Sequence, residues 1–444
     1  MTDPLRIAQF TDNYGPGRSG ILYAVQQLEG ALLEAGHEVI VVAPSAKGPN
    51  PYANHPGRTE VRLPSVRVPG VPARVATGRH AEALVRGVGE LKPDVIHVHG
   101  PGIIGLMGVA LARRTGIPLV VTWHTDFAAY VEHYALLSPV MGAAYHVWRV
   151  AAGTGVIDDV EARQGAIAYR QAGRQRMVAD LLGAGNAMLT AATVVITPSP
   201  KTAKRVLTWT PDVDIRTIPN GVDPLPMNGP AVKRFPGVRF AYVGRIAPEK
   251  GIGVLLDAYR IVRKSVPGTE LMIVGDWKKV PSLRARLLRA KRHPEVQLVG
   301  EVDRSSLGPY YASADVFVFP SMTDTQALVL HEAAHAGLPL IICDTELDLV
   351  LEDRVNGEFC APTPDALAGA MLRMMDRVND PVSRAKAAAV SRERAGRYTL
   401  ATQNKAVLDL YEEVARGVRK APVRPHAPGR FARTWKRVAA MARV

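Results

Sequence analysis

The stretch VRFAYVGRIAPEKGIGVLLDAY, residues 238–259, contains the pattern that is most informative about the fold class. A short apolar run ends at Gly244, a loop with two cations follows, and an amphipathic segment begins near Gly251. Short apolar runs that Gly or Pro closes are typical of strands buried on both faces of a parallel sheet. The stretch is therefore predicted to form one strand, one loop and one helix of a doubly wound α/β domain.

Similar runs recur along the chain, and the segments between them are long enough for helices. They are residues 38–44, 94–100 and 117–125 in the first half, and 238–244, 270–275, 296–300, 315–320 and 338–343 in the second. This alternation predicts two doubly wound α/β domains. A length of 444 residues agrees, because an ordinary domain holds about 100 to 200.

Composition indicates where the domains meet. A segment rich in Pro, Gly and Asn near residues 220–235 is expected to be the linker, which assigns the domains to residues 1–220 and 221–395. Residues 128–190, rich in Ala, Gly and Arg, are expected to form a helical insertion in the first domain. Residues 396–418 are expected to form a C-terminal helix that returns to the first domain, and a basic tail follows.

The formal net charge of +14 is concentrated in this tail, residues 419–444. The tail has eight Lys and Arg and no Asp or Glu, so the rest of the chain carries +6. No nucleic-acid partner is expected, because most of the excess lies outside the domains. Phe431, Trp435 and Val438 recur at helical spacing, which favours an amphipathic helix on an anionic membrane surface. A solvated, disordered tail is the alternative.

No targeting or membrane-spanning segment is recognisable. No uninterrupted apolar run reaches about 18 residues, and the N-terminus lacks the pattern of a secretory signal. Cys343 and Cys360 are too few for a disulfide framework and are expected to be buried, reduced thiols. The sequence predicts a cytoplasmic protein, with peripheral association at the inner face of the membrane.

The N-terminal segment YGPGRSGILYAVQQL, residues 14–28, has the spacing of a dinucleotide-binding fingerprint at Gly15, Gly17 and Gly20. Four residues separate these glycines from the preceding strand, whereas the fingerprint glycine follows its strand almost at once. The second strand ends VVAPS and lacks the acid that would bind a ribose. The loop is expected to lie close to a phosphate group of a ligand and to bind no NAD or other cofactor. An NAD-dependent oxidoreductase is the remoter alternative.

Two pairs of charged residues carry the chemistry of the second half. Arg245 and Lys250 flank a turn before a helix, where a bidentate guanidinium, a point-like ammonium and backbone amides suit a diphosphate. Asp324 and Glu332 are eight residues apart, which predicts two carboxylates on one helix face with Thr323 or Asp324 as the N-cap. The alternative is a purely structural role for all four residues. Arg245 and Lys250 would then be surface cations, Asp324 a helix cap, and Glu332 a buried acid paired with another side chain.

Three motifs together resemble the retaining glycosyltransferases of family 4, which have the GT-B fold. They are GRIAPEKG (244–251), the acid pair that continues into HEAAHAGLP (331–339), and IPNGVD (218–223). The resemblance covers about residues 5–415. It implies two Rossmann-like domains that face each other across a cleft, no bound metal, and a nucleotide diphosphate sugar held mainly by the C-terminal domain.

The resemblance also implies a role for each site residue. Arg245 and Lys250 would neutralise the leaving diphosphate, and Glu332 would hold the ribose. Asp324 would contact the donor sugar, and His124, in TWHTD, would contact the transferred sugar and the reacting centre. The other implied donor positions are Gly20, Gly300, Val302, Ala327 and Leu328. The family usually has Glu where Asp324 stands, Gly where Ala327 stands, and a second glycine where Ser19 stands.

The segment HTDFAAYVEHY (124–134), the insertion and the basic tail are similar to the glycolipid-making branch of the family. This branch contains diacylglycerol glucosyltransferases and mannosyltransferases of actinobacterial lipids. The resemblance implies transfer of a hexose from UDP-glucose or GDP-mannose to a lipid acceptor, with retained configuration. A soluble sugar or polysaccharide acceptor, and a nucleotide-sugar epimerase of GT-B fold, are the alternatives.

Overall fold

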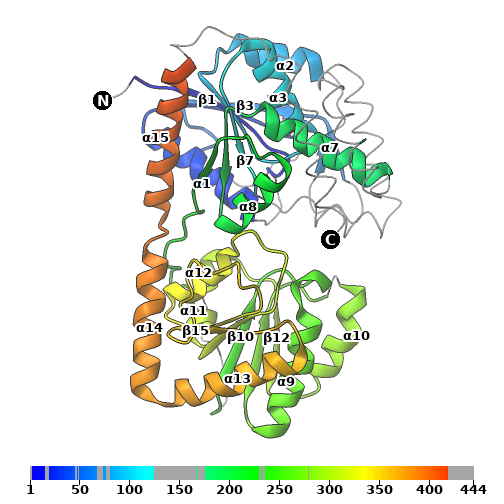
Figure 1. The fold of residues 1–444 in the computed structure, drawn as a ribbon, viewed down its shortest axis with the longest axis vertical. Coiled ribbons are helices and arrows are strands. Elements are labelled where there is room, and N and C mark those ends of the chain that lie inside the picture. Colours follow the sequence, from blue (N-terminus) through cyan, green and yellow to red (C-terminus); the bar gives the residue numbers. More distant parts are fainter. Residues whose placement is uncertain are drawn as a thin grey trace. The chain divides into compact units, whose positions relative to one another are not determined.

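The protein is described from a computed structural model (Figure 1). It describes residues 3–418 apart from 16–19, 46–47, 49, 68–73, 77–80, 125–166, 168–175, 230–231, 233–235 and 279. Contacts within the chain divide it into two compact units. The N-terminal unit ends at Pro219 and resumes at Asn404, and the C-terminal unit is Asn220–Gln403.

The N-terminal unit is built on a seven-stranded sheet with the order β3-β2-β1-β6-β7-β8-β9. Neighbouring strands run parallel throughout. The strands are β1 (Arg6–Phe10), β2 (Glu38–Pro44), β3 (Arg58–Leu63), β6 (Val95–Val98), β7 (Leu119–Thr122), β8 (Val194–Thr197) and β9 (Ile215–Thr217). A short antiparallel pair, β4 (Ser65–Arg67) and β5 (Arg74–Ala76), stands apart from this sheet.

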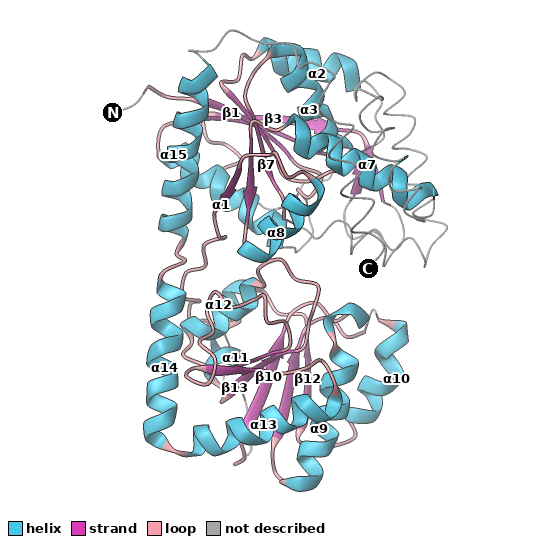
Figure 2. Cartoon of the chain, in the orientation of Figure 1, coloured by secondary structure: helices cyan, strands magenta, loops and turns pink. Residues whose placement is uncertain are grey.

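Helices cover both faces of this sheet (Figure 2). One buried apolar cluster joins it to α2 (Ala81–Glu90), α3 (Ile103–Thr115), α7 (Arg176–Ala191) and α8 (Pro200–Trp209). A second cluster joins it to α1 (Gly20–Glu34) and to α15 (Leu400–Val418). The central strands are therefore buried on both faces, which explains why their sequences are continuous apolar runs.

The C-terminal unit has a six-stranded sheet with the order β12-β11-β10-β13-β14-β15, again parallel throughout. Its strands are β10 (Arg239–Val243), β11 (Glu270–Val274), β12 (Val296–Gly300), β13 (Val316–Phe319), β14 (Leu340–Ile342) and β15 (Gly357–Phe359). Its helices are α9 (Ile252–Ser265), α10 (Pro281–Ala290), α11 (Gly308–Ala312), α12 (Leu328–His335), α13 (Pro364–Asn379) and α14 (Pro381–Gly396), with short 3₁₀ turns η2 (Pro248–Lys250) and η3 (Arg304–Ser306).

Counted along the chain within each unit, the first six strands of both sheets follow the Rossmann order 3-2-1-4-5-6. The order reverses between β1 and β6 in one unit and between β10 and β13 in the other. Ligands of such sheets bind at the carboxyl ends of the strands beside this reversal. All eight apolar runs predicted to be strands are strands, and the predicted strand, turn and helix of residues 238–259 are confirmed.

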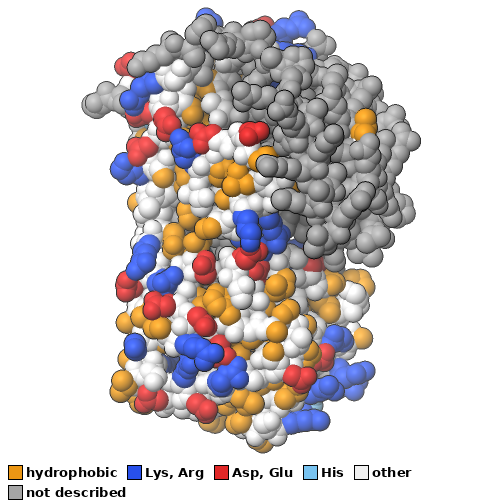
Figure 3. Space-filling view, in the orientation of Figure 1, with side chains coloured by type: hydrophobic (Ala, Val, Ile, Leu, Met, Phe, Trp, Pro, Cys, Tyr) orange, Lys and Arg blue, Asp and Glu red, His pale blue; other side chains and the backbone are white. Residues whose placement is uncertain are grey.

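Some of the segments predicted from the sequence lie partly or wholly outside the described residues. Of the predicted insertion, α7 is described, whereas most of residues 128–175 and the whole tail lie outside the described residues. No described helix has the length and apolar character needed to span a bilayer. Both cysteines are free thiols with their Sγ atoms 3.7 Å apart, but Cys360 is only partly buried, so the prediction of two buried thiols is right for Cys343 and wrong for Cys360. Over the face of the C-terminal unit visible in Figure 3, basic and acidic side chains are intermixed.

Candidate active site

The loop after β10 brings a helix start next to the end of β13. Gly251 adopts a left-handed backbone with φ 69° and is the N-cap of α9. A Cβ atom at this position would lie 2.6 Å from the carbonyl oxygen of Pro320, so only glycine allows this approach. The loops after β10 and β13 therefore meet beside the reversal of strand order.

Lys250 lies in this loop and pairs with Asp324 from the loop after β13. Its Nζ atom is 2.7 Å from Oδ1 of Asp324, and the side chains are 14% and 20% exposed. The other carboxylate oxygen, Oδ2, accepts a hydrogen bond from the Ser321 hydroxyl. The structure thus brings two of the predicted site residues together and holds the ammonium group at the carboxyl edge of the sheet.

Arg245 directly follows Gly244 at the end of β10 and forms an ion pair with Glu249. The Arg245 side chain is 51% exposed, so it is open to solvent and to ligands. Its backbone carbonyl accepts a hydrogen bond of 2.9 Å from the buried Tyr242 hydroxyl, which fixes the start of the loop. Each predicted cation therefore has an acidic neighbour that holds its position.

The helix after β13 begins later than predicted. α12 starts at Leu328 with Ala327 as its N-cap, so the prediction of Thr323 or Asp324 as the N-cap is wrong. Asp324 lies in the loop, and the expectation that both carboxylates share one helix face is therefore also wrong. The Asp324 oxygens already accept from Ser321 and from Lys250, which is 74 residues away in the chain, so they do not cap the helix. Ala327 has a left-handed φ of 59° and no side-chain cap within the described chain.

Glu332 lies on α12 and is almost completely buried. Its Oε2 accepts a hydrogen bond of 2.7 Å from the Tyr311 hydroxyl, and its Oε1 is 2.8 Å from Nη2 of Arg304. Burial raises the pKa of Glu332, while Arg304 and Tyr311 act in the opposite direction. Sequence reasoning missed both partners, because α11 and η3 approach α12 only in the folded chain.

Gln326 connects the same loop to the IPNGVD motif. Its Oε1 accepts from both the backbone N–H and the side-chain amide of Asn220, each at 2.8 Å. Its Nε2 donates to the Asn220 carbonyl at 2.9 Å. Three hydrogen bonds between two residues therefore fix the chain just before Ala327 to the IPNGVD motif.

The predicted base-binding positions lie at the end of β12, the edge strand next to β11. The carbonyl of Gly300 accepts a hydrogen bond of 2.8 Å from the backbone N–H of Gly275 at the end of β11. Open space surrounds the position where a Gly300 Cβ would stand. Val302 is partly buried and packs against the core of the C-terminal unit. This edge offers exposed backbone next to an apolar side chain, which suits a planar base.

In the N-terminal unit, the loop after β1 is tied to the helix after β6. Asp12 accepts hydrogen bonds from the backbone N–H groups of Ile104 and Gly105 at 3.1 and 3.2 Å. Burial raises the pKa of Asp12 to about 6, against these hydrogen bonds. This carboxylate therefore caps the first turn of α3, a contact that the sequence did not reveal.

The glycine loop of this unit begins at a buried anchor. The Tyr14 hydroxyl donates to Glu29, and the Tyr14 carbonyl accepts from Nη1 of Arg62 at 3.1 Å. Gly20 is the first residue of α1 and is exposed. Residues 16–19 between them lie outside the described chain, so the predicted phosphate contact of this loop stays a prediction.

His124 follows β7, two residues after the last strand residue, Thr122. Its Nε2 is 3.2 Å from Nδ1 of His99, which follows β6. Burial lowers the pKa of His124 to about 4 and that of His97, on β6, to about 3. The predicted reacting histidine is therefore a neutral imidazole at pH 7, and it lies at the carboxyl edge of the sheet.

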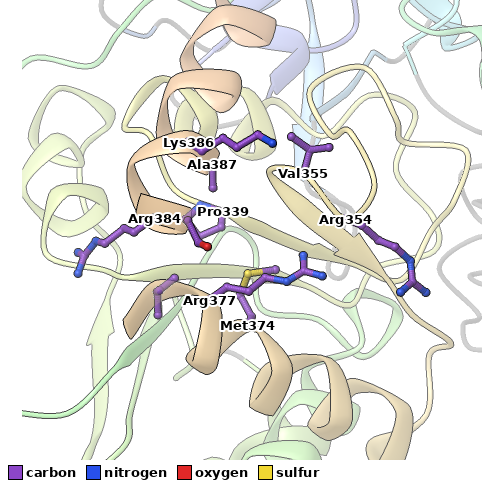
Figure 4. Close-up of a pocket in the computed structure, with 10 residues that line it drawn as sticks. Pro339, Arg354, Val355, Met374, Arg377, Arg384, Lys386 and Ala387 are labelled. Carbon is purple, nitrogen blue, oxygen red and sulfur yellow. The ribbon is translucent and has the colours of Figure 1, made fainter. Parts of the chain in front are cut away.

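A cavity of about 190 Å³ lies at the opposite edge of the C-terminal sheet, where β14 and β15 begin (Figure 4). Four cations line it, Arg354, Arg377, Arg384 and Lys386, together with the apolar side chains of Pro339, Met374 and Ala387. Arg384 turns toward Asp315, with which it forms an ion pair of 2.8 Å. None of the predicted donor residues lines this cavity, and we do not assign the donor to it.

Known proteins share both halves of this arrangement. Residues 18–224 match the family described as Glycosyltransferase Family 4, and residues 237–377 match Glycosyl transferases group 1. A GDP-mannose-dependent alpha-mannosyltransferase of Mycobacterium tuberculosis is 30% identical over 379 residues, which cover 82% of this chain and 87% of that protein. The chain belongs to glycosyltransferase family 4.

Other relatives of this family 4 glycosyltransferase extend the comparison. An alpha-monoglucosyldiacylglycerol synthase of Acholeplasma laidlawii is 28% identical over 375 residues, covering 80% of this chain and 84% of that one. The solved structure of sucrose-phosphate synthase from Thermosynechococcus elongatus has a TM-score of 0.67 at 20% identity and covers 93% of this chain and 100% of that chain. The predicted family and the predicted GT-B fold class are confirmed.

Proposed function

We propose that this glycosyltransferase moves a hexose from UDP-glucose or GDP-mannose to a lipid acceptor at the inner face of the membrane, with retained configuration. The observation that carries the proposal is the ion pair of Lys250 and Asp324 beside the start of α12, at the reversal of strand order. The two relatives support the donor and acceptor classes, since one is an alpha-monoglucosyldiacylglycerol synthase and the other a GDP-mannose-dependent alpha-mannosyltransferase.

The C-terminal unit would stabilise the leaving group. Negative charge builds on the diphosphate as the glycosidic bond breaks, and stabilising it is the largest contribution that the enzyme can make. Lys250 and Arg245 would neutralise this charge, and the backbone N–H groups at Ala327 and Leu328 would donate to it. Glu332 would accept from the ribose hydroxyls, while Gly300 and Val302 would border the base.

Three further residues would act on the transferred sugar, the diphosphate or the acceptor. Asp324 would accept hydrogen bonds from its hydroxyls, and its fixed contact with Lys250 would place the sugar relative to the diphosphate. His124 would contact the sugar at the reacting centre. Gly20, at the start of α1, would lie near the diphosphate and the acceptor, where a helix N-terminus favours negative charge.

A screen of donors and acceptors tests the reaction itself. Radiolabelled UDP-glucose and GDP-mannose are offered to the full chain, each with diacylglycerol, with mixed bacterial lipids or with soluble sugars. Label in the organic phase supports the proposal and identifies the donor. Label in a soluble product would replace the lipid with a sugar acceptor, and interconversion of the nucleotide sugar without an acceptor would indicate an epimerase.

Side-chain cations replace a metal in this proposal. Because Lys250 and Arg245 supply the positive charge, EDTA is expected to leave the transfer rate unchanged within about twofold. The measurement is the initial rate after dialysis against EDTA, with and without added Mg²⁺ or Mn²⁺. A strict requirement for either metal would contradict this part of the proposal.

The basic tail would hold the enzyme at the membrane. Each Lys or Arg near an anionic surface contributes about 1 kcal/mol, and the tail also offers Phe431 and Trp435. Truncation after Val418 keeps α15 complete and is expected to abolish salt-sensitive binding to vesicles that contain phosphatidylglycerol. Nucleotide affinity should stay unchanged. If the truncated protein still sediments with these vesicles, the insertion after Tyr134 is the next candidate.

A further inference from the structure

A row of buried polar side chains leads from the C-terminal helix to His124. Tyr411 on α15 contacts His97 on β6, His97 packs against His99, and His99 contacts His124. Tyr411, His97 and His99 are at most 2% exposed. All of them belong to the N-terminal unit, and His97 on β6 and His99 just after it lie on the same side because side chains alternate along an extended chain.

Both ring nitrogens of His97 are engaged. Nδ1 is 2.5 Å from the Tyr411 hydroxyl, and Nε2 is 2.7 Å from the Thr122 hydroxyl of the adjacent strand β7. The ring therefore has no freedom to rotate. The His99 ring packs on it with a centroid distance of 3.9 Å and an interplanar angle of 39°. His97 thus fixes the plane of His99.

The hydrogen bonds of His99 indicate where the protons of the pair lie. Its Nε2 is buried and has no hydrogen-bond partner in the described chain, while its Nδ1 is 3.2 Å from Nε2 of His124. A buried N–H group without an acceptor is rarer than a buried acceptor without a donor. The proton of a neutral His99 therefore belongs on Nδ1, from which it is donated to Nε2 of His124.

This arrangement determines the tautomer of His124. A neutral imidazole has one donor and one acceptor nitrogen, so His124 carries its own proton on Nδ1 when Nε2 accepts. Burial keeps the pKa of His99 well below its usual range, and the neighbouring His97 and His124 lower it further. All three rings are neutral at pH 7, and the distinction between tautomers is meaningful.

We propose that His99 is a positioning residue for the transfer reaction, which holds the His124 ring in one orientation and with its proton on Nδ1. The proposal rests on the proposed role of His124 at the reacting centre. His99 itself is not required to touch the sugar. Its contribution is a single donated hydrogen bond, supported from behind by His97, Thr122 and Tyr411.

Substitutions that keep or move this donor test the proposal. The amide nitrogen of asparagine takes the place of Nδ1, whereas that of glutamine takes the place of Nε2. The kcat of His99→Asn is expected to stay within about fivefold of the wild-type value. The kcat of His99→Gln and of His99→Leu is expected to fall by about 30-fold or more. KM for the donor should change by less than threefold in all three. Melting temperatures identify any variant that fails to fold, and the Asn and Gln pair keeps the polarity of the site matched.

A double-mutant cycle separates this proposal from the proposed function. In a His124→Ala background, His99→Leu is expected to change the residual kcat by less than threefold, because its partner is already absent. The full loss in that background, or equal activities of the Asn and Gln variants, would overturn the positioning role. A His124→Ala enzyme with normal activity would instead contradict the role proposed for His124, whatever His99 does.

Discussion

The helix after the fourth Rossmann strand begins differently in the two units. In the N-terminal unit, the Asp12 carboxylate accepts hydrogen bonds from the first turn of α3. In the C-terminal unit, α12 begins at Ala327 without a side-chain cap from any described residue. A carboxylate at a helix start occupies and repels the site of an anion, whereas uncapped amides attract one. The same strand order therefore gives one helix start after the fourth strand, that of α12, which suits a diphosphate, and one, that of α3, which does not.

The titratable groups at the carboxyl edges of the two sheets also differ, because one edge holds charged side chains and the other holds neutral ones. The C-terminal edge holds charged pairs, with Lys250 on Asp324 and Arg304 on Glu332. The N-terminal edge holds neutral histidines whose pKa values are lowered by burial. Charged groups are therefore found where the leaving group is proposed to form, and neutral groups fixed by hydrogen bonds are found where the sugar is proposed to react.

The largest effect is expected from removing the cations of the charged edge. Lys250→Ala and Arg245→Ala are each predicted to lower kcat by about 10²-fold or more, on the order of 3 kcal/mol of lost charge stabilisation. Loss of Lys250 also leaves Asp324 without its ammonium partner, so this variant should be the slower one. Steady-state kinetics with the identified donor measure both.

The chain offers matched controls for both cations. Lys405 pairs with Asp409 at 2.7 Å, the same distance as in the site, but its side chain is 77% exposed on α15. Arg397 pairs with Glu393 four residues earlier, as Arg245 pairs with Glu249 four residues later. Lys405→Ala and Arg397→Ala should leave kcat unchanged. Equal activities of site and control variants would remove the diphosphate assignment.

The second prediction divides the charged edge into a nucleotide part and a sugar part. Glu332→Gln is expected to weaken binding of the bare nucleotide about tenfold, because it removes an ionised acceptor. Asp324→Asn is expected to leave that affinity within about twofold and to slow transfer instead. Calorimetry with UDP or GDP, followed by kinetics, measures the difference. Equal losses of nucleotide affinity would show that the two roles are not separate.

The strands and the cation pair were predictable from sequence for a common reason. Strands buried on both faces must be short apolar runs, and the residues that follow them must meet at one edge, so 238–259 was sufficient to place Arg245 and Lys250. The start of α12 was not predictable, because a partner 74 residues away decides whether Asp324 can cap. Arg304, Tyr311 and Asp12 were missed for the same reason.

The row of histidines was missed although its residues are visible in the sequence. His97 and His99 appear in the chain only as two polar residues that end an apolar run. Their meaning depends on Tyr411, which is 314 residues from His97 and reaches it because α15 packs on the N-terminal sheet. A contact of this range leaves no local pattern in the sequence.

The third prediction tests the neutral edge through its response to acid. At pH values below about 6.5, the ordinary pKa of histidine, these residues are protonated in the unfolded chain but stay neutral in the folded chain. Their contribution to stability is therefore present above pH 6.5 and is lost as the pH falls toward about 4 for His124 and about 3 for His97. Asp12, with its pKa raised to about 6, opposes this loss in part.

The free energy of unfolding should accordingly fall by at least about 1 kcal/mol between pH 7 and pH 5. Hydrogen exchange should report the loss in the N-terminal unit first, since His331 is the one described histidine of the other unit whose pKa is lowered, to about 3. Denaturant titration of His97→Gln at both pH values is the control and should show a smaller difference. Exchange that rises first in residues 220–403 would contradict the assignment of the acid-sensitive histidines to the N-terminal unit.

The smallest effect is expected at Ala327, the uncapped start of α12. A left-handed backbone costs an alanine about 1 to 2 kcal/mol, whereas glycine adopts it freely but loses about 0.4 to 1 kcal/mol more through the unfolded state. Ala327→Gly should therefore raise the free energy of unfolding by about 0.5 kcal/mol and change kcat by less than threefold. Ala336, at the other end of α12, has an ordinary helical φ of −68°, so Ala336→Gly is the matched control and should destabilise. If both substitutions destabilise equally, the backbone of Ala327 is not strained. The hydrogen bonds of the preceding residue, Gln326, would then be sufficient to account for the position of the uncapped helix start.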